Sequence, residues 1–218
     1  SNGRRAMAHL IHLWHERNGW SHRVLPLLSE ILDLGKVHNS QISNLRNGKL
    51  SSPGPEVFLA LAQVNTILDQ GIDVIRDRLE HDYPELWRSL QESALPLKND
   101  SGNPLSAGEL FEIFSGLKSL PSSFDWYIED EEASALSDAL SQHFCQNRPW
   151  RACKIKVMEA YSVNKSNRRE RFAEVIAGIR DYTAEELDGE LLDLYEASKK
   201  LSYFDGRGPN NFLAELRN

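Results

Sequence analysis

The sequence predicts an all-α protein with a four- to five-helix N-terminal domain followed by a helical C-terminal domain. Three observations predict this fold. Apolar residues recur at helical spacing along most of the chain. Helix-start signals and Gly or Asn-Gly stop signals separate these runs. The 218 residues, 40% of them apolar, are enough to bury one sizeable core or two small ones.

The first two expected helices lie before residue 33. The first extends through Ala6–Trp14 and ends at Asn18-Gly19, a common stop signal. Ser21 is expected to cap the second helix. Pro26 must then lie in its first turn or kink the helix, because a proline deeper in a helix removes a backbone hydrogen bond. The apolar stripe of the second helix is Val24, Leu27, Leu28, Ile31 and Leu32.

The next two expected helices flank a proline-rich turn. In the short segment 39–47, Ile42 and Leu45 are three residues apart and should face inward, with Gly48 ending the helix. The turn at 51–55 then leads to a helix over 56–68. One face of that helix carries Phe58, Leu61, Ala62, Val64 and Leu68.

The polar side of segment 39–47 carries amides rather than full charges. The run Ser40-Gln41-Ile42-Ser43-Asn44-Leu45-Arg46-Asn47-Gly48-Lys49, followed by the proline turn and a Leu-rich helix, resembles the helix-turn-helix of the phage-repressor class, also called Xre or lambda-repressor-like. The resemblance covers about residues 8–68. It differs from the family pattern in the added residues 34–37, in Asn39 where the family often has Gln, and in Arg46 where it often has Glu.

This resemblance implies a DNA-binding domain over residues 6–70, with helix 39–47 inserted into the major groove of double-stranded DNA. An amide carries both a donor and an acceptor and can bind adenine bidentately, so we expect the base-reading residues to be Asn39, Ser40, Gln41 and Asn44. The expected phosphate contacts are Ser43, Arg46, Lys49 and Lys36, and Ser40 can also anchor a phosphate. The alternative interpretation is that these asparagines merely favour a helix start and a Gly-rich stop.

Charge is distributed unevenly along the chain. Residues 1–68 contain seven Lys and Arg against four acids, whereas the rest contains 18 basic residues against 28 acidic ones. This asymmetry supports different partners for the two parts. We therefore expect a cytoplasmic transcription regulator that acts as a homodimer on half-sites one duplex turn apart. The alternative function is a helical protein–protein adaptor that does not bind DNA.

The remaining chain is expected to be helical. Connecting helices occupy 71–97, the turn-rich stretch 98–104 is the candidate linker, and residues 105–218 form a domain for dimerisation or signal reception. Ser106 with Glu109 and Thr183 with Glu186 have the spacing of capping boxes. Further helices are expected near 131–144, 150–161 and 168–180, although the alternation at 154–157 would also suit a short strand.

A basic island lies within the acidic C-terminal part. Residues 147–171 contain eight Lys and Arg against two Glu. The island could contact phosphates, pair with acids at a subunit contact, or form a solvated helix face. The residues of the possible second basic surface are Arg148, Arg151, Lys154, Lys165, Arg168 and Arg169.

No pattern in the sequence indicates catalysis. Two Ser-x-x-Lys matches lack the companion Lys-Thr-Gly, and there is no phosphate-binding glycine loop. His12 and Glu16 are one helical turn apart, but no complementary ligand cluster exists elsewhere, so we expect no metal and no cofactor. Cys145 and Cys153 are expected to be reduced. No apolar run reaches the length of a membrane span, and no secretion leader is recognised.

Overall fold

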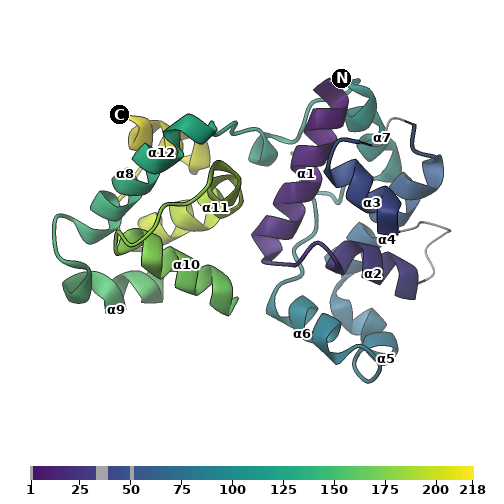
Figure 1. Cartoon of the computed structure of the whole chain (residues 1–218), viewed down its shortest axis with the longest axis horizontal. Coiled ribbons are helices and arrows are strands. Elements are labelled where there is room, and N and C mark those ends of the chain that lie inside the picture. The colour runs from purple at the N-terminus through teal and green to yellow at the C-terminus, as the bar shows by residue number, and fades with distance from the viewer. Residues whose placement is uncertain (1, 33–38, 50–51) are drawn as a thin grey trace. The chain divides into compact units, whose positions relative to one another are not determined.

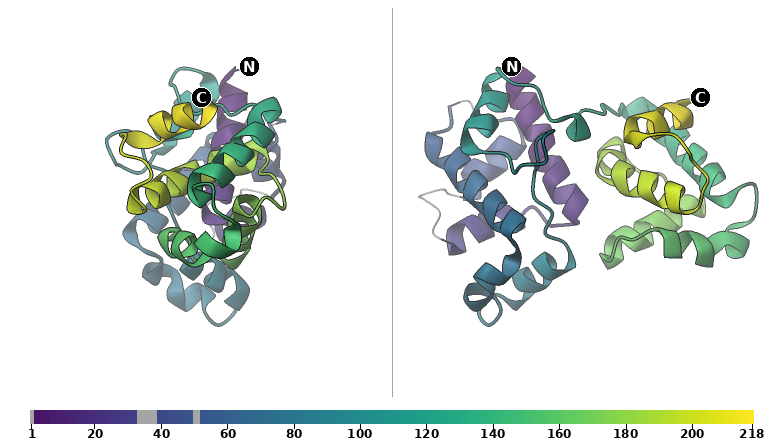
Figure 2. Two further views of the ribbon diagram at one scale, coloured as in Figure 1. Left: turned by 90° about the vertical axis from the view of Figure 1, so that its left-hand side faces the viewer. Right: turned by 180° about the vertical axis from the view of Figure 1, so that it is seen from behind.

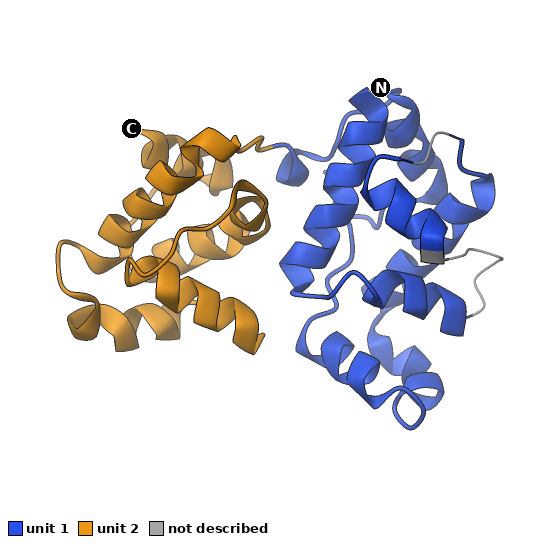
Figure 3. Cartoon of the chain, viewed as in Figure 1, with its two compact units in different colours: residues 1–125 blue, residues 126–218 orange. Residues whose placement is uncertain are grey.

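The chain forms two compact helical units, residues 1–125 and 126–218, in a computed structural model that describes residues 2–32, 39–49 and 52–218 (Figures 1 and 3). The all-α class is confirmed, and no strand forms within the described ranges. None of the described helices is long and apolar enough to cross a bilayer. The helices of unit 1 are α1 (Asn2–Asn18), α2 (Val24–Ile31), α3 (Asn39–Arg46), α4 (Pro55–Gln70), the 3-10 helix η1 (Ile72–Ile75), α5 (Arg76–Leu79), α6 (Pro84–Glu92), α7 (Ala107–Ser115) and the 3-10 helix η2 (Ser122–Phe124).

The core of unit 1 is built around α1 and α4. Helix α1 packs against α3 and α7, and α4 packs against α2 and α7; Figure 2 shows the same group from behind. Of the apolar positions expected to face inward, Ile42, Leu45, Phe58, Leu61 and Val64 are buried. Leu27, Ile31 and Ala62 are half-buried against the same core. Four amphipathic helices thereby share one core before residue 71.

The start of α2 differs from the prediction. Arg23 occupies the N-cap position, and no side chain caps the helix. Ser21 instead accepts a hydrogen bond from the Val24 amide through its backbone carbonyl (3.1 Å), so residues 21–23 form a turn before the helix. Pro26 lies in the first turn, as predicted, where no intrahelical donor is needed.

A fully buried asparagine joins the end of α1 to the segment after α6. The Asn18 amide nitrogen donates to the carbonyls of Trp14 (2.9 Å) and Leu95 (3.2 Å). Its carbonyl oxygen accepts from the Leu95 amide and the Ser93 hydroxyl, each at 2.7 Å. The indole of Trp14 also donates to the Leu95 carbonyl, at 3.0 Å. Asn18 therefore satisfies backbone groups of an extended segment that has no sheet partner there.

A second buried asparagine continues this arrangement from α4. The Asn65 side chain accepts a hydrogen bond from the Leu97 amide (2.6 Å) and donates to the carbonyls of Leu97 (2.8 Å) and Leu105 (3.3 Å). Leu97 and Leu105 also pair directly, through the Leu105 amide and the Leu97 carbonyl at 2.9 Å. The turn-rich stretch 98–104 is thus a hairpin-like loop fixed to the core of unit 1.

The boundary between the units consequently differs from the expected linker at 98–104. Unit 1 continues through α7 to Asp125, and unit 2 begins at Trp126. Helix α7 belongs to unit 1 because Leu110 and Ile113 are fully buried in its core. The expected capping box at the start of α7 is present, with the Ser106 side chain accepting from the Glu109 amide.

Unit 2 is a helical group with its own core. Phe144, Phe172 and Phe212 are fully buried there. The possible strand at 154–157 does not form, because these residues lie inside α9. The elements of unit 2 are the 3-10 helix η3 (Asp130–Glu132), α8 (Ala133–Cys145), α9 (Trp150–Ala160), α10 (Ser166–Ile176), α11 (Ala184–Lys200), capped by Thr183 and Glu186 as predicted, and α12 (Gly208–Arg217).

We expect Asn65→Ala to lower the free energy of unfolding of the full chain by about 2–4 kcal/mol, because it leaves buried backbone groups at Leu97 and Leu105 without partners. Gln63→Ala, at an exposed position of the same helix, is the matched control and should change it by less than about 0.5 kcal/mol. Denaturant titration measures both. Equal effects of the two substitutions would contradict a structural role for the Asn65 amide.

Candidate nucleic-acid interface

Helix α3 is attached to unit 1 by two apolar side chains. Ile42 and Leu45 are each 1% exposed and pack toward α1 and α2. The helix ends as predicted at Gly48, whose φ of 66° is in the left-handed region that glycine adopts without strain. The Gly48 amide donates to the Leu45 carbonyl (3.1 Å) and the Lys49 amide to the Asn44 carbonyl (2.8 Å). This stop fixes the length of the helix at two turns.

The expected base-reading residues have different exposures. Ser40 and Asn44 are exposed and lie one turn apart on the same face of α3. Gln41 is half-buried. Asn39 begins the helix, but its side chain lies outside the described residues. Two polar side chains able to hydrogen-bond base edges therefore stand in solvent on α3.

A pocket of about 310 Å³ lies beside α3, where it meets the start of α2. Two of the expected phosphate contacts, Ser43 and Arg46, line it. Lys49 is exposed outside the pocket, and Lys36 lies outside the described residues. The complete lining is His22, Arg23, Pro26, Leu27, Ser43 and Arg46.

The sequence prediction did not include His22 and Arg23. Both precede α2, some twenty residues before Arg46, so only the packing of α2 on α3 brings them into the pocket. The one local signal was a basic pair directly before a helix start. Their presence gives the pocket three cationic or potentially cationic side chains and one hydroxyl, with no acidic residue in its lining.

One hydrogen-bond donor of Arg46 is unused within the described part of the chain. Its Nε is buried and, among the described residues, has no hydrogen-bond partner. A buried donor without a partner is costly. Independently of this atom, Arg23 and Arg46 both line the pocket, and guanidinium groups bind anions through charge-assisted hydrogen bonds. The pocket therefore has the chemistry of an anion site of the kind that holds a phosphate.

The charge of Arg46 also acts on α1. His15 is 6% exposed; its Nδ1–H donates to the Ile11 carbonyl (2.9 Å), and its ring meets the edge of Trp20. The pKa of His15 is lowered to about 4, mainly by burial. The hydrogen bond to Ile11 opposes this shift, and the positive charge of Arg46 adds to it. At neutral pH the imidazole is uncharged and serves packing.

Only some residues of the expected second basic surface in unit 2 are exposed. Arg148, Arg151 and Lys154 are exposed, and Lys165 is half-buried. The prediction was wrong for Arg168, which is buried. Arg169 is half-buried and donates to the carbonyls of Met158 (3.1 Å), Tyr161 (2.7 Å) and Val163 (2.9 Å), so it satisfies backbone oxygens in the last turn of α9 and just after it.

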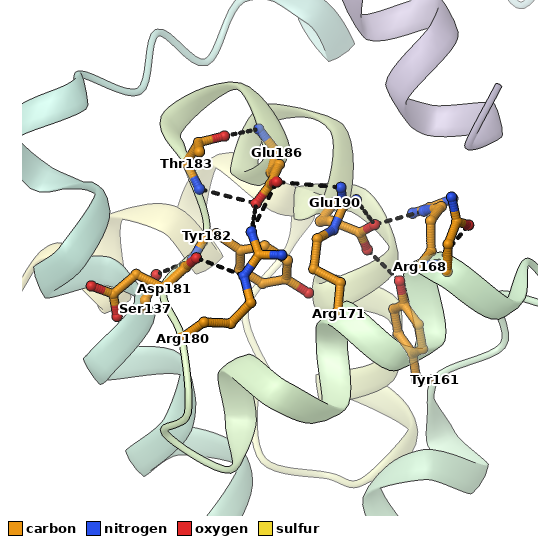
Figure 4. A network of polar contacts seen from close by, with 11 residues as sticks. Ser137, Tyr161, Arg168, Arg171, Arg180, Asp181, Tyr182, Thr183, Glu186 and Glu190 are labelled. Carbon is orange, nitrogen blue, oxygen red and sulfur yellow. Dashed lines mark hydrogen bonds and ion pairs between the residues drawn. The ribbon is translucent and has the colours of Figure 1, made fainter. Parts of the chain in front are cut away.

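Arg168 belongs to a buried network around Glu190 of α11 (Figure 4). Glu190 is fully buried and accepts from Arg168 Nε at 2.6 Å, from an Arg171 Nη at 2.9 Å and from the Tyr161 hydroxyl. Arg168 also pairs with Asp193 at 2.7 Å. Because both carboxylate oxygens are occupied by side chains of α10 and the end of α9, the network joins these helices to α11. Its role is structural, since buried charges require such pairing.

Two matches to protein families cover most of the chain. Residues 1–116 match the family described as Domain of unknown function (DUF8644), and residues 133–218 match the one described as Domain of unknown function (DUF8645). The first match covers more than half of the 218 residues. No curated protein and no solved structure matches the chain.

We expect the stability of unit 1 to fall between pH 6.5 and about 4 because of His15. Its folded pKa of about 4 lies below the ordinary histidine value of 6.5, so the unfolded chain binds the proton first as pH falls. The loss reaches at most about 3 kcal/mol near pH 4 and is absent above neutrality. In His15→Gln, unfolding free energies measured across this range should lose that part of the slope, whereas His81→Gln, an exposed control, should keep it.

We expect Glu190→Gln to destabilise unit 2 by about 3–5 kcal/mol, because the two arginines would keep buried charges without their carboxylate. Glu196→Gln, exposed on the same helix, should have an effect below about 0.5 kcal/mol. Calorimetric unfolding of the two full-length variants provides the comparison. A Glu190 variant as stable as the control would show that the network contributes nothing to folding.

Proposed function

We propose that this chain, which belongs to the DUF8644 family, binds double-stranded DNA sequence-specifically by inserting α3 into the major groove. The observation that carries the proposal is the division of α3 into two sides. Ile42 and Leu45 fix the helix to the core, while Ser40 and Asn44 remain exposed beside the cationic pocket. The resemblance of residues 8–68 to phage-repressor helix-turn-helix domains supports the same use of the helix.

The exposed side of α3 and the cationic pocket would make different kinds of contact with DNA. Asn44 offers a donor and an acceptor, which match the N6 and N7 edge of adenine, and Ser40 adds a hydroxyl one turn earlier. A good bidentate pair of this kind contributes about 1–3 kcal/mol of discrimination between bases. The pocket, with Arg46 and Arg23, would hold a backbone phosphate and so fix the register of α3 without reading sequence.

The excess of basic residues over residues 1–68 favours the same partner, because nonspecific affinity for DNA is mainly electrostatic. A regulator of this kind acts as a homodimer with two reading helices about 34 Å apart. We therefore place the protein in the cytoplasm as a dimeric transcription regulator, with unit 2 serving dimerisation or signal reception.

A protein–protein adaptor is the second candidate. The observation that favours it is a set of exposed apolar side chains of unit 1: Leu59 (52% exposed) on α4, Phe111 (51%) on α7 and Leu117 (77%) just after it. Such side chains are typical of contact surfaces when they are contiguous. An adaptor would use them and would leave the polar side of α3 unused.

Selection of binding sites from a randomised duplex pool by the full-length protein tests the proposal. An enriched motif is expected, with affinity that falls steeply as salt concentration rises. Asn44→Ala should broaden base preference at one position, while Gln63→Ala, at an exposed position of α4, should leave it unchanged.

Arg46→Ala should weaken binding to all sequences and reduce the salt slope by about one. Arg88→Ala, at an exposed position of α6, is its control. An unenriched pool, together with unchanged binding by the Arg46 variant, would reject DNA recognition and favour the adaptor.

A further inference from the structure

The two cysteines of the chain meet inside unit 2. Cys145 ends α8 and Cys153 lies in the first turn of α9, and their sulfur atoms are 3.4 Å apart. Both thiols are free and buried, Cys145 at 7% exposure and Cys153 at 1%. The sequence spacing of eight residues gave no indication of this contact.

The turn between α8 and α9 produces the contact. Gln146 and Asn147 both have left-handed backbone conformations, with φ of 51° and 61°, and reverse the chain directly after Cys145. The Arg148 amide donates to the Cys145 carbonyl (3.0 Å) and closes the turn, and Pro149 is the N-cap residue of α9. Left-handed conformations are uncommon for residues other than glycine, so packing of the two helices must stabilise this turn.

We propose that Cys145 and Cys153 are a site of reversible oxidation, at which a two-electron oxidant such as hydrogen peroxide joins them in an intramolecular disulfide. A disulfide requires a sulfur–sulfur distance of about 2.05 Å, so the two sulfurs together must approach by about 1.4 Å. Because they already touch, small side-chain rotations and helix shifts can supply that approach. The function proposed for unit 1 does not enter this inference.

The reaction balances with peroxide as the only co-reactant. The Cys145 thiolate, on the more exposed of the two residues, attacks one peroxide oxygen; the O–O bond breaks, giving a sulfenic acid and hydroxide. The Cys153 sulfur then attacks the sulfenic sulfur and displaces its oxygen as water. Overall, two thiols and one peroxide become a disulfide and two waters.

Burial makes this oxidation slow at neutral pH. Burial, together with the neighbouring Cys153, raises the pKa of the Cys145 thiol to about 12, and only the thiolate is an effective nucleophile. Below that pKa the thiolate fraction rises about tenfold for each pH unit, and the oxidation rate should follow it.

The test uses the full-length protein treated with hydrogen peroxide while folded, then denatured and alkylated. Because the chain contains only these two cysteines, alkylatable thiols should fall from two to none per chain, and dithiothreitol should restore both. Trypsin cleaves after Arg151, between the cysteines. Mass spectrometry should therefore find the peptide 152–154 disulfide-linked to the peptide that contains Cys145.

Cys145→Ser and Cys153→Ser serve as controls, and neither variant should form an internal cross-link. The peptide map is measured on the unaltered protein, so its result holds even if one of these variants fails to fold. Two thiols that stay alkylatable after peroxide treatment would overturn the proposal. So would disulfides only between chains, or sulfinic acid in place of the linked peptides.

Discussion

Two buried asparagines fix the extended segment 93–97 to α1 and α4, and the rest of unit 1 is arranged around that contact. Asn18 and Asn65 each act as donor and acceptor toward its backbone, so they replace the sheet partner that the segment lacks. Because an amide without such partners would be costly to bury, the segment has one register. That register places α7 against α1 and α4, which completes the core on which α3 is mounted.

In unit 2, buried charged side chains rather than buried amides join the helices. Glu190 is as buried as the two asparagines, yet it bears a carboxylate that requires Arg168, Arg171 and Tyr161 around it. A network of this kind tolerates little displacement, which explains how short helices are held in one arrangement. It also removes from the surface two of the charges that the sequence places in a basic island.

The polar side of α3 differs from both buried networks. Asn44 has the same amide as Asn18 and Asn65, but it stands in solvent, on the same helix as the pocket residues Ser43 and Arg46. Inside the core an amide is satisfied by the chain itself, whereas on α3 it is available to another molecule. This contrast is the physical reason for proposing that α3, rather than the buried polar groups, recognises another molecule.

The sequence alone determined the helices, because apolar periodicity, capping boxes and glycine stops act within one or two turns. It therefore predicted α3, with Ile42 and Leu45 facing inward, and it singled out Ser43 and Arg46, which line the pocket beside α2. Only the tertiary structure decided which polar residues are buried, since the exposure of a charged side chain depends on which elements pack against it. His22 and Arg23 entered the pocket, and Arg168 left the surface, through contacts between helices that are distant along the chain. The unit boundary at Asp125 was decided in the same way, because the hydrogen bonds of Asn65 to Leu97 and Leu105 fix the linker-like stretch between them to the core of unit 1.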